Sequence, residues 1–178
     1  MARPSGQRLN AACRCGQTTI ELTGAPILSA VCCCNDCRTA GRQFEQAPGA
    51  PPVVGPDGGT PYSLYRKDRV RIALGRGHLR DHRLDPSSPT RRVVAACCNS
   101  PMFLDFTKGC WLSVYRDRLG SDAPPLEMRV MAKDAPEGSG RADDIPTYPK
   151  FPPAFMIKLL GAWAAMGFRR PEVAGERT

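Results

Sequence analysis

Eight of the nine cysteines in this chain of 178 residues fall in three short groups, and this grouping constrains the fold more than any other feature. The groups are Cys13 and Cys15 in CRCG, Cys32–Cys37 in CCCNDC, and Cys97–Cys98. Thiols grouped in this way act as metal ligands, disulfide partners or buried apolar side chains. Each role would place the protein in a different class.

The cellular compartment decides much of the choice between these roles. The first residues contain no apolar run that could form a secretory signal, and no later stretch offers about twenty uncharged apolar residues for a membrane span. We therefore expect a cytoplasmic protein with no membrane association. In a reducing compartment, clustered cysteines more often bind metals or act in catalysis than form disulfides. A metal site is the preferred interpretation, and a disulfide framework in an exported protein is the alternative.

The charge of the chain is strongly positive. Lysine and arginine number 25 against 17 aspartates and glutamates, which gives a net charge of +8. Such a surface attracts anions, whether nucleic acid, membrane phosphate or a small carboxylate. The arginines are scattered, however, and form no continuous basic block, so no nucleic-acid partner is expected.

Short apolar or alternating segments dominate the chain, and clusters of proline and glycine separate them. This pattern predicts one mostly β domain built from antiparallel strands. The segment 47–61 is rich in proline and glycine and predicts a long loop that covers a site. The predicted strands lie at 18–22, 27–33, 62–65, 70–74, 92–96, 102–106, 111–115 and 128–132.

The last third of the chain differs in composition. We expect a zinc-binding β domain over residues 1–134, a Pro/Gly-rich linker over 135–153 and a C-terminal helix over 154–168. The helix is expected to pack on the domain or on a partner subunit, because its sequence leaves almost no polar face for water. A homodimer through this helix is one such arrangement. The apolar residues that recur at helical spacing are Phe155, Leu159, Ala162, Trp163 and Met166.

Alternation in extended backbone brings thiols together within the second cysteine group. Cys32 and Cys34 point to one side, and Cys37 can fold back toward them through a turn. Three thiolates can then converge on one point. Zinc is the natural occupant because it accepts tetrahedral thiolate coordination, whereas the spacings match none of the common iron–sulfur patterns.

The first and third groups can form a second site. Cys13 and Cys15 share one side of an extended segment, and Cys97 and Cys98 could join them on one metal. That metal would tie the N-terminal strand to the middle of the sheet, as a structural site does. The second group then supplies only three ligands, and an open coordination position is typical of a metal that binds substrate.

Other residues have less specific interpretations. Arg38 follows the third ligand of the second group and is a candidate for binding a substrate carboxylate, although a surface arginine or helix partner would look the same. Cys33 and Cys110 are interpreted as buried apolar residues. His78 and His82 could share a metal, but the alternation around them favours a half-exposed strand.

Taken in order, several motifs resemble the glutathione-dependent formaldehyde-activating enzyme family, which also includes vertebrate centromere protein V. They are CRCG, CxCxxCR at Cys32–Arg38, Gly41, Tyr65, an arginine-rich strand and CNSPM at Cys98–Met102. The resemblance covers about residues 11–106. It implies a β-tent of antiparallel sheets, with one structural zinc and one exchangeable zinc at which glutathione binds. The implied structural site contains Cys13, Cys15 and Cys98, and the implied catalytic site contains Cys32, Cys34 and Cys37.

The third motif departs from the family pattern. The family usually has two cysteines separated by two residues, and here the first of them is replaced by Ala95. Adjacent strand residues point to opposite faces, so Cys97 can join Cys98 on one metal only if the backbone bends. The candidates for the fourth ligand are Cys97, then a water, then Cys110 or a histidine. Asn99 stands where the family often has glycine, and asparagine tolerates a left-handed turn.

The resemblance and the ligand count together predict a zinc-dependent carbon–sulfur lyase. Its substrate would be an adduct of glutathione, or another small thiol, with formaldehyde or a related small electrophile. The predicted catalytic residues are Cys32, Cys34, Cys37 and Arg38. The alternative is a non-catalytic zinc module that binds a protein or nucleic acid through its basic surface.

Overall fold

The computed structural model describes residues 8–139 and 143–173, which form ten strands and two α-helices. The helices are α1 (Asn35–Glu45) and α2 (Pro153–Ala164). The strands are β1 (Arg8–Ala12), β2 (Thr19–Thr23), β3 (Leu28–Cys32), β4 (Thr60–Arg66), β5 (Val70–Leu74), β6 (Leu79–His82), β7 (Thr90–Ala95), β8 (Ser100–Phe106), β9 (Trp111–Tyr115) and β10 (Met128–Val130).

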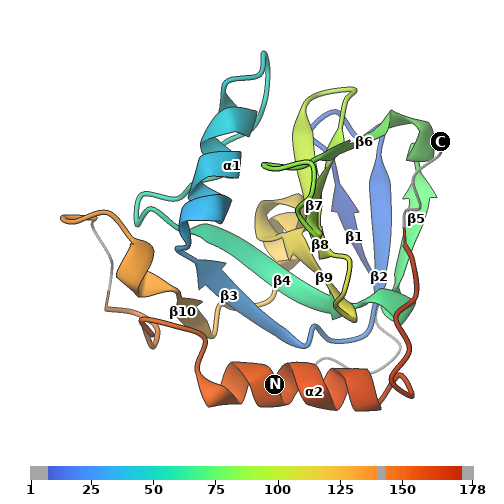
Figure 1. Cartoon of the computed structure of the whole chain (residues 1–178). Helices are drawn as coiled ribbons and strands as arrows, with labels where there is room; N and C mark the ends of the chain where they lie inside the picture. Colours follow the sequence, from blue (N-terminus) through green and yellow to red (C-terminus); the bar gives the residue numbers. More distant parts are fainter. Residues whose placement is uncertain (1–7, 140–142, 174–178) are drawn as a thin grey trace.

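The strands form two sheets (Figure 1). The smaller sheet has the order β1-β2-β5, and the larger has the order β10-β3-β4-β9-β8-β7-β6. The pairs are antiparallel except for β10, which runs parallel to β3. The chain reaches the free edge of β3 only after a long connection from β9, and such a connection allows the parallel direction. The expectation of antiparallel strands is therefore correct for every pair but this one.

The larger sheet buries both of its faces. Alternation along β4 shows this, because Leu64 belongs to one core and its neighbour Tyr65 to another. The core between the two sheets includes Leu9, Ile20, Leu22, Ile72, Val93, Phe103 and Leu112. The core on the opposite face, where both helices pack, includes Leu28, Phe44, Tyr62, Leu64, Phe155 and Leu159. In Figure 1, α1 lies above β3 and β4 and α2 lies below them.

The mostly β fold and the C-terminal helix are confirmed. Each of the eight predicted strands corresponds to an observed strand with small shifts at its ends, and β6 contains the predicted half-exposed segment around His82. The segment 47–59 forms no helix or strand, and β4 begins at Thr60. Strand β1 and helix α1 were not predicted.

Helix α1 begins where the sequence indicated only a turn. Cys34 caps its N-terminus, and its Sγ accepts a hydrogen bond from the backbone N–H of Cys37. Cys37, Ala40 and Phe44 are buried and give the helix an apolar face at the expected spacing. Gly41 allows the close approach of the following loop, since a Cβ there would lie 2.5 Å from Cγ2 of Val54. The helix therefore holds the second cysteine group against the sheet.

Helix α2 begins after Pro152 and ends four residues before the predicted boundary. Phe155 and Leu159 are buried against the larger sheet, whereas Ile157 is 68% exposed and Leu160 57%. The homodimer through this helix stays a prediction. Within residues 8–139 and 143–173, the structure contains no helix with the length and apolar character needed to cross a membrane.

Candidate metal centres

Two groups of cysteine sulfurs converge in the described residues, and they could hold metal ions. The four-cysteine cluster comprises Cys13, Cys15, Cys97 and Cys98, and the three-cysteine cluster comprises Cys32, Cys34 and Cys37. Within each cluster the sulfurs lie within 4.8 Å of one another. The sequence grouped the same residues.

The four-cysteine cluster has nearly the spacing of a tetrahedral site. Cys13 Sγ lies 3.6 Å from Cys15 Sγ and 3.7 Å from Cys97 Sγ, and Cys97 Sγ lies 4.0 Å from Cys98 Sγ. Four sulfurs at about 2.3 Å from a central zinc would be about 3.8 Å apart. The donor set therefore fits a zinc ion of this coordination.

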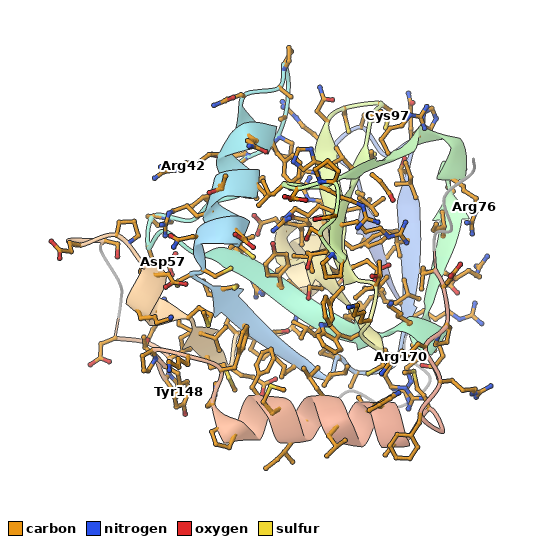
Figure 2. The ribbon with its side chains drawn as sticks, viewed as in Figure 1. Arg42, Asp57, Arg76, Cys97, Tyr148 and Arg170 are labelled. Carbon is orange, nitrogen blue, oxygen red and sulfur yellow. The ribbon has the colours of Figure 1, made fainter. Side chains whose placement is uncertain are left out.

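Two turns bring these four sulfurs together. In the first, after β1, the N–H of Gly16 donates to the carbonyl of Cys13 over 3.0 Å. The second joins β7 to β8 over residues 96–99 and closes with Asn99 in the left-handed region at φ 54°. Cys97 and Cys98 thus lie in a turn, and the bend required for both to reach one metal is present. Figure 2 labels Cys97 at the side of the strands opposite α2.

A serine at the start of β8 links the two turns. Ser100 Oγ lies 3.1 Å from Cys98 Sγ and accepts a hydrogen bond from the backbone N–H of Arg14 over 3.0 Å. Partial burial opposes ionisation of Cys98, but hydrogen bonds with Ser100, Cys15 and Cys13 together outweigh it and lower the pKa of this thiol to about 6. The cluster therefore contains a thiol that ionises readily, as a metal ligand must.

The three-cysteine cluster lies where β3 meets α1. Cys32 ends the strand, Cys34 caps the helix and Cys37 lies in the first helical turn. Cys32 Sγ is 3.4 Å from Cys34 Sγ, and the backbone N–H of Cys37 donates to Cys34 Sγ over 3.4 Å. The sequence predicted that a turn brings the three thiols together. In the structure, the end of β3 followed directly by α1 does so.

Charge in the three-cysteine cluster concentrates on its central sulfur. Hydrogen bonds from the side chains of Cys32 and Cys37, and from the backbone N–H of Cys37, lower the pKa of Cys34 to about 2 despite its burial. Its position at a helix N-terminus favours the same ionised state. The hydrogen bond to Cys34, together with burial, raises the pKa of Cys32 well above its ordinary value. Without a metal, one thiolate is therefore shared between two thiols.

This cluster lines a cavity of about 460 Å³. Cavity walls come from β4, β8, β9 and α2 and are mainly apolar, with Leu64, Leu104, Trp111, Phe155 and Leu159 among them. Tyr62 also lines the cavity, and its hydroxyl donates to Cys37 Sγ over 3.7 Å. Burial raises the pKa of Tyr62 well above its ordinary value, so this hydroxyl stays protonated. The four-cysteine cluster does not line this cavity.

Arg38 does not line the cavity either. Its guanidinium donates to the backbone carbonyl of Asp134 over 2.7 Å and also to Asn35 Oδ1. These contacts join α1 to the loop after β10. The binding of a substrate carboxylate by Arg38 stays a prediction, and the observed contacts support a structural role.

The other singled-out residues lie outside both clusters. Cys33 and Cys110 are buried, as expected, and Cys110 Sγ lies 3.9 Å from the carbonyl oxygen of Leu159. His82 Nε2 lies 3.0 Å from Gln43 Oε1, and neither His82 nor His78 joins a group of potential metal ligands among the described residues.

One cavity residue was missed in the sequence. Arg92 of β7 is 2% exposed and lines the cavity together with the three-cysteine cluster. The sequence indicated an arginine-rich strand there but gave no reason to choose this arginine. Its positive charge contributes to the low pKa of Cys34.

Residues 8–48 match the sequence model of a family described as glutathione-dependent formaldehyde-activating enzyme. The predicted family resemblance is confirmed. The segment that matches the glutathione-dependent formaldehyde-activating family runs from β1 through α1 and carries five of the seven cluster cysteines.

No curated protein matches the chain. A crystal structure of a Rhodobacter sphaeroides protein, determined as a structural genomics target, is similar over 79% of this chain and 100% of its own. The two sequences are 13% identical, and the TM-score is 0.49.

Proposed function

We propose that this protein is a zinc-dependent enzyme of the carbon–sulfur lyase type. It would form or cleave the adduct between a small thiol, glutathione first of all, and formaldehyde or a related small electrophile. The observation that carries the proposal is the three-cysteine cluster in the wall of a largely apolar cavity. The family match over residues 8–48 supports the choice of thiol and aldehyde.

Zinc is the metal that these donors suit best. Both clusters offer only cysteine sulfur, which favours zinc over the hard cations magnesium and calcium. Four sulfurs complete the coordination of a structural ion, whereas three leave a position that a substrate thiol can take. When bound in the three-cysteine cluster, zinc would lower the pKa of that thiol and hold it as a thiolate. A cytoplasmic location, where thiols stay reduced, is part of the proposal.

The reaction proposed is redox-neutral. In the forward direction, the thiolate sulfur forms a bond to the aldehyde carbon, and the electron pair of the carbonyl double bond moves onto oxygen, which takes up a proton. In the reverse direction, the hydroxyl loses its proton, the carbonyl re-forms and the carbon–sulfur bond breaks with its electron pair returning to sulfur. The apolar cavity walls reduce the water available to hydrate the aldehyde.

Two residues of the cavity have proposed roles in this reaction. The hydroxyl of Tyr62 is a protonated donor beside Cys37 and can orient a ligand at the cluster. Cys34, at the helix N-terminus, holds negative charge before any metal binds and so prepares the cluster for a cation. Orientation of the thiol and the aldehyde in the cavity would supply a further part of the acceleration.

The test follows the exchange of ¹³C-formaldehyde with its glutathione adduct by NMR, using zinc-loaded protein. We expect wild type to accelerate exchange and the double variant Cys34→Ser, Cys37→Ser to lose at least about 100-fold of that acceleration. Cys110→Ala removes a buried thiol outside both clusters and serves as the matched control. Equal acceleration by the double variant would refute the proposal, and so would glutathione binding to wild type without any acceleration.

A further inference from the structure

Arg92 projects from the larger sheet onto the face that carries the cavity. Cross-strand partners share a face, and the register joins Leu64 to Ser113, Ser113 to Leu104 and Leu104 to Arg92 in one row. All four residues line the cavity. The guanidinium is therefore built into the wall of the site that also contains the three-cysteine cluster.

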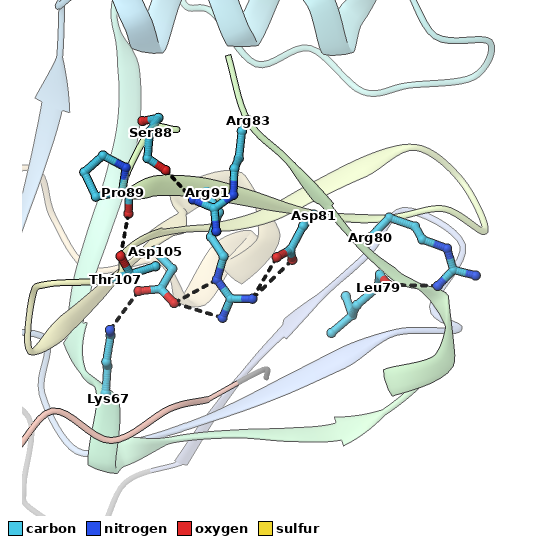
Figure 3. Close-up of polar contacts among 10 residues, drawn as sticks. All are labelled: Lys67, Leu79, Arg80, Asp81, Arg83, Ser88, Pro89, Arg91, Asp105 and Thr107. Carbon is cyan, nitrogen blue, oxygen red and sulfur yellow. Dashed lines mark hydrogen bonds and ion pairs between the residues drawn. The ribbon is translucent and has the colours of Figure 1, made fainter. Parts of the chain in front are cut away.

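The neighbouring arginine shows how this fold treats a buried guanidinium elsewhere. Arg91 points to the opposite face and pairs with Asp105 and Asp81, each over 2.9 Å, and Lys67 pairs with Asp105 over 2.8 Å (Figure 3). Two cations thus meet two carboxylates. Each buried positive charge has a negative partner, as burial of charge normally requires.

Arg92 has no such partner. Among the described residues, no carboxylate forms an ion pair with it. Nη2 donates to the backbone carbonyl of Asp36 over 3.2 Å, and the guanidinium also forms a hydrogen bond with the side chain of Tyr115. Nε is buried without a hydrogen-bond partner. Asp36 also borders the cavity, but this residue is exposed and its carboxylate forms no ion pair with Arg92. A buried cation with free hydrogen-bonding capacity favours an anion in the adjoining space.

We propose that Arg92 binds a carboxylate of the ligand that occupies the cavity. The ligand class is then a small thiol acid, with its sulfur at the three-cysteine cluster and its carboxylate at Arg92. The sulfur half of this assignment rests on the proposed function, whereas the carboxylate half rests on Arg92 alone. The competing explanation is that Arg92 serves only as counter-ion to the thiolates, in which case the cavity has no preference for an acid.

Calorimetry on the zinc-loaded protein separates these explanations with matched probes. The first pair is 3-mercaptopropionate and 3-mercaptopropionamide, which differ only in the charge of the group beyond the thiol. We expect wild type to bind the acid about tenfold or more tightly than the amide, as for a charge-assisted hydrogen bond in a buried site. Arg92→Gln should reduce this ratio to about one, Arg92→Lys should retain part of it, and Arg42→Gln, at an exposed position of α1, should retain all of it.

The outcomes distinguish this inference from the proposed function. Butyrate and butyramide repeat the comparison without sulfur, so an Arg92-dependent preference for butyrate would support the inference even if the thiol adds nothing to affinity. Equal affinities of wild type for each acid and its amide overturn the inference, and this measurement needs no variant to fold. A preference that persists in folded, zinc-loaded Arg92→Gln overturns it as well.

Discussion

The two cysteine clusters use similar ligands in opposite ways. The four-cysteine cluster joins positions 84 residues apart, since Cys13 belongs to the turn after β1 and Cys97 to the turn between β7 and β8. The three-cysteine cluster takes all its sulfurs from the segment Cys32–Cys37. The first therefore connects the two sheets, whereas the second belongs to one strand end and one helix.

The distance along the sequence between the cysteines of a cluster indicates what a metal bound there would do. A link that closes a long loop removes much entropy from the unfolded chain, while a link within six residues removes little. The four-cysteine cluster also lies outside the cavity, and the three-cysteine cluster forms part of its wall. We therefore assign stability to the first and ligand binding to the second, and each prediction below tests that division.

The largest expected effect is on the free energy of unfolding when the four-cysteine cluster loses a buried ligand. Cys13 is 3% exposed, and its Sγ lies 3.6 Å from Cys15 Sγ and 3.7 Å from Cys97 Sγ. Cys13→Ser should lower the free energy of unfolding by about 3–5 kcal/mol, because loss of a structural metal is among the most costly single changes. Urea denaturation monitored by circular dichroism, with zinc content measured on the same samples, checks this.

The matched control is Cys110→Ala, which removes a buried thiol that ligates nothing in either cluster. It should cost about 1–2 kcal/mol and leave the zinc content unchanged. If Cys13→Ser were no more destabilising than this control, the structural role of the four-cysteine cluster would be rejected.

A smaller loss of stability is expected at the fourth ligand of the same cluster. Cys97 lies in the turn between β7 and β8 and was the first of several candidates for the fourth ligand in the sequence analysis. Unlike Cys13, it is only partly buried. Cys97→Ser should cost about 2 kcal/mol and weaken zinc binding without abolishing it, because a hydroxyl or a water can complete the coordination. Competition with a colorimetric chelator measures the zinc affinity. An unchanged affinity would remove Cys97 from the ligand set.

The sequence predicted the clusters better than it predicted their surroundings. Alternating thiols and punctuated strands are local signals, and they gave the cysteines that converge and most of the strands correctly. Helix α1 was missed because its cap is Cys34, a residue type that rarely signals a helix start, although the spacing of Cys37, Ala40 and Phe44 was visible in the sequence. The turn that lets Cys97 reach its partners depends on where β7 ends.

Nothing in the sequence distinguishes Arg92 from Arg91. It is adjacent to Arg91 in the sequence, and both belong to the same alternating strand. Their difference lies in the groups that face them, because Asp81 and Asp105 come from β6 and β8 and reach only one side of the sheet. Strand register and sheet order decide this, and neither follows from the pattern of a single segment.

For the three-cysteine cluster we expect a small effect on stability and a large effect on ligand binding. Cys34→Ser in the three-cysteine cluster should change the free energy of unfolding by about 1 kcal/mol or less. The three cysteines of this cluster are close along the chain, so a metal that joins them removes little entropy from the unfolded state. Cys34→Ser should nevertheless remove one of the two zinc ions that the proposed function requires, and with it the binding of glutathione. Mass spectrometry under native conditions gives the zinc count, and calorimetry gives the glutathione affinity. A destabilisation as large as that of Cys13→Ser would erase the distinction between the clusters.

The smallest effect is expected at Arg38. This prediction tests whether the arginine that binds the ligand's carboxylate comes from α1 or from β7. The guanidinium of Arg38 is occupied by the carbonyl of Asp134 and by Asn35, outside the cavity lining. Arg38→Gln should therefore cost about 1 kcal/mol of stability or less through the lost link to the loop after β10. It should leave the tenfold preference for 3-mercaptopropionate over its amide unchanged, whereas Arg92→Gln abolishes it. If Arg38→Gln removed the preference and Arg92→Gln did not, the sequence-based choice of Arg38 would be correct, and the cavity wall at β7 would be structural.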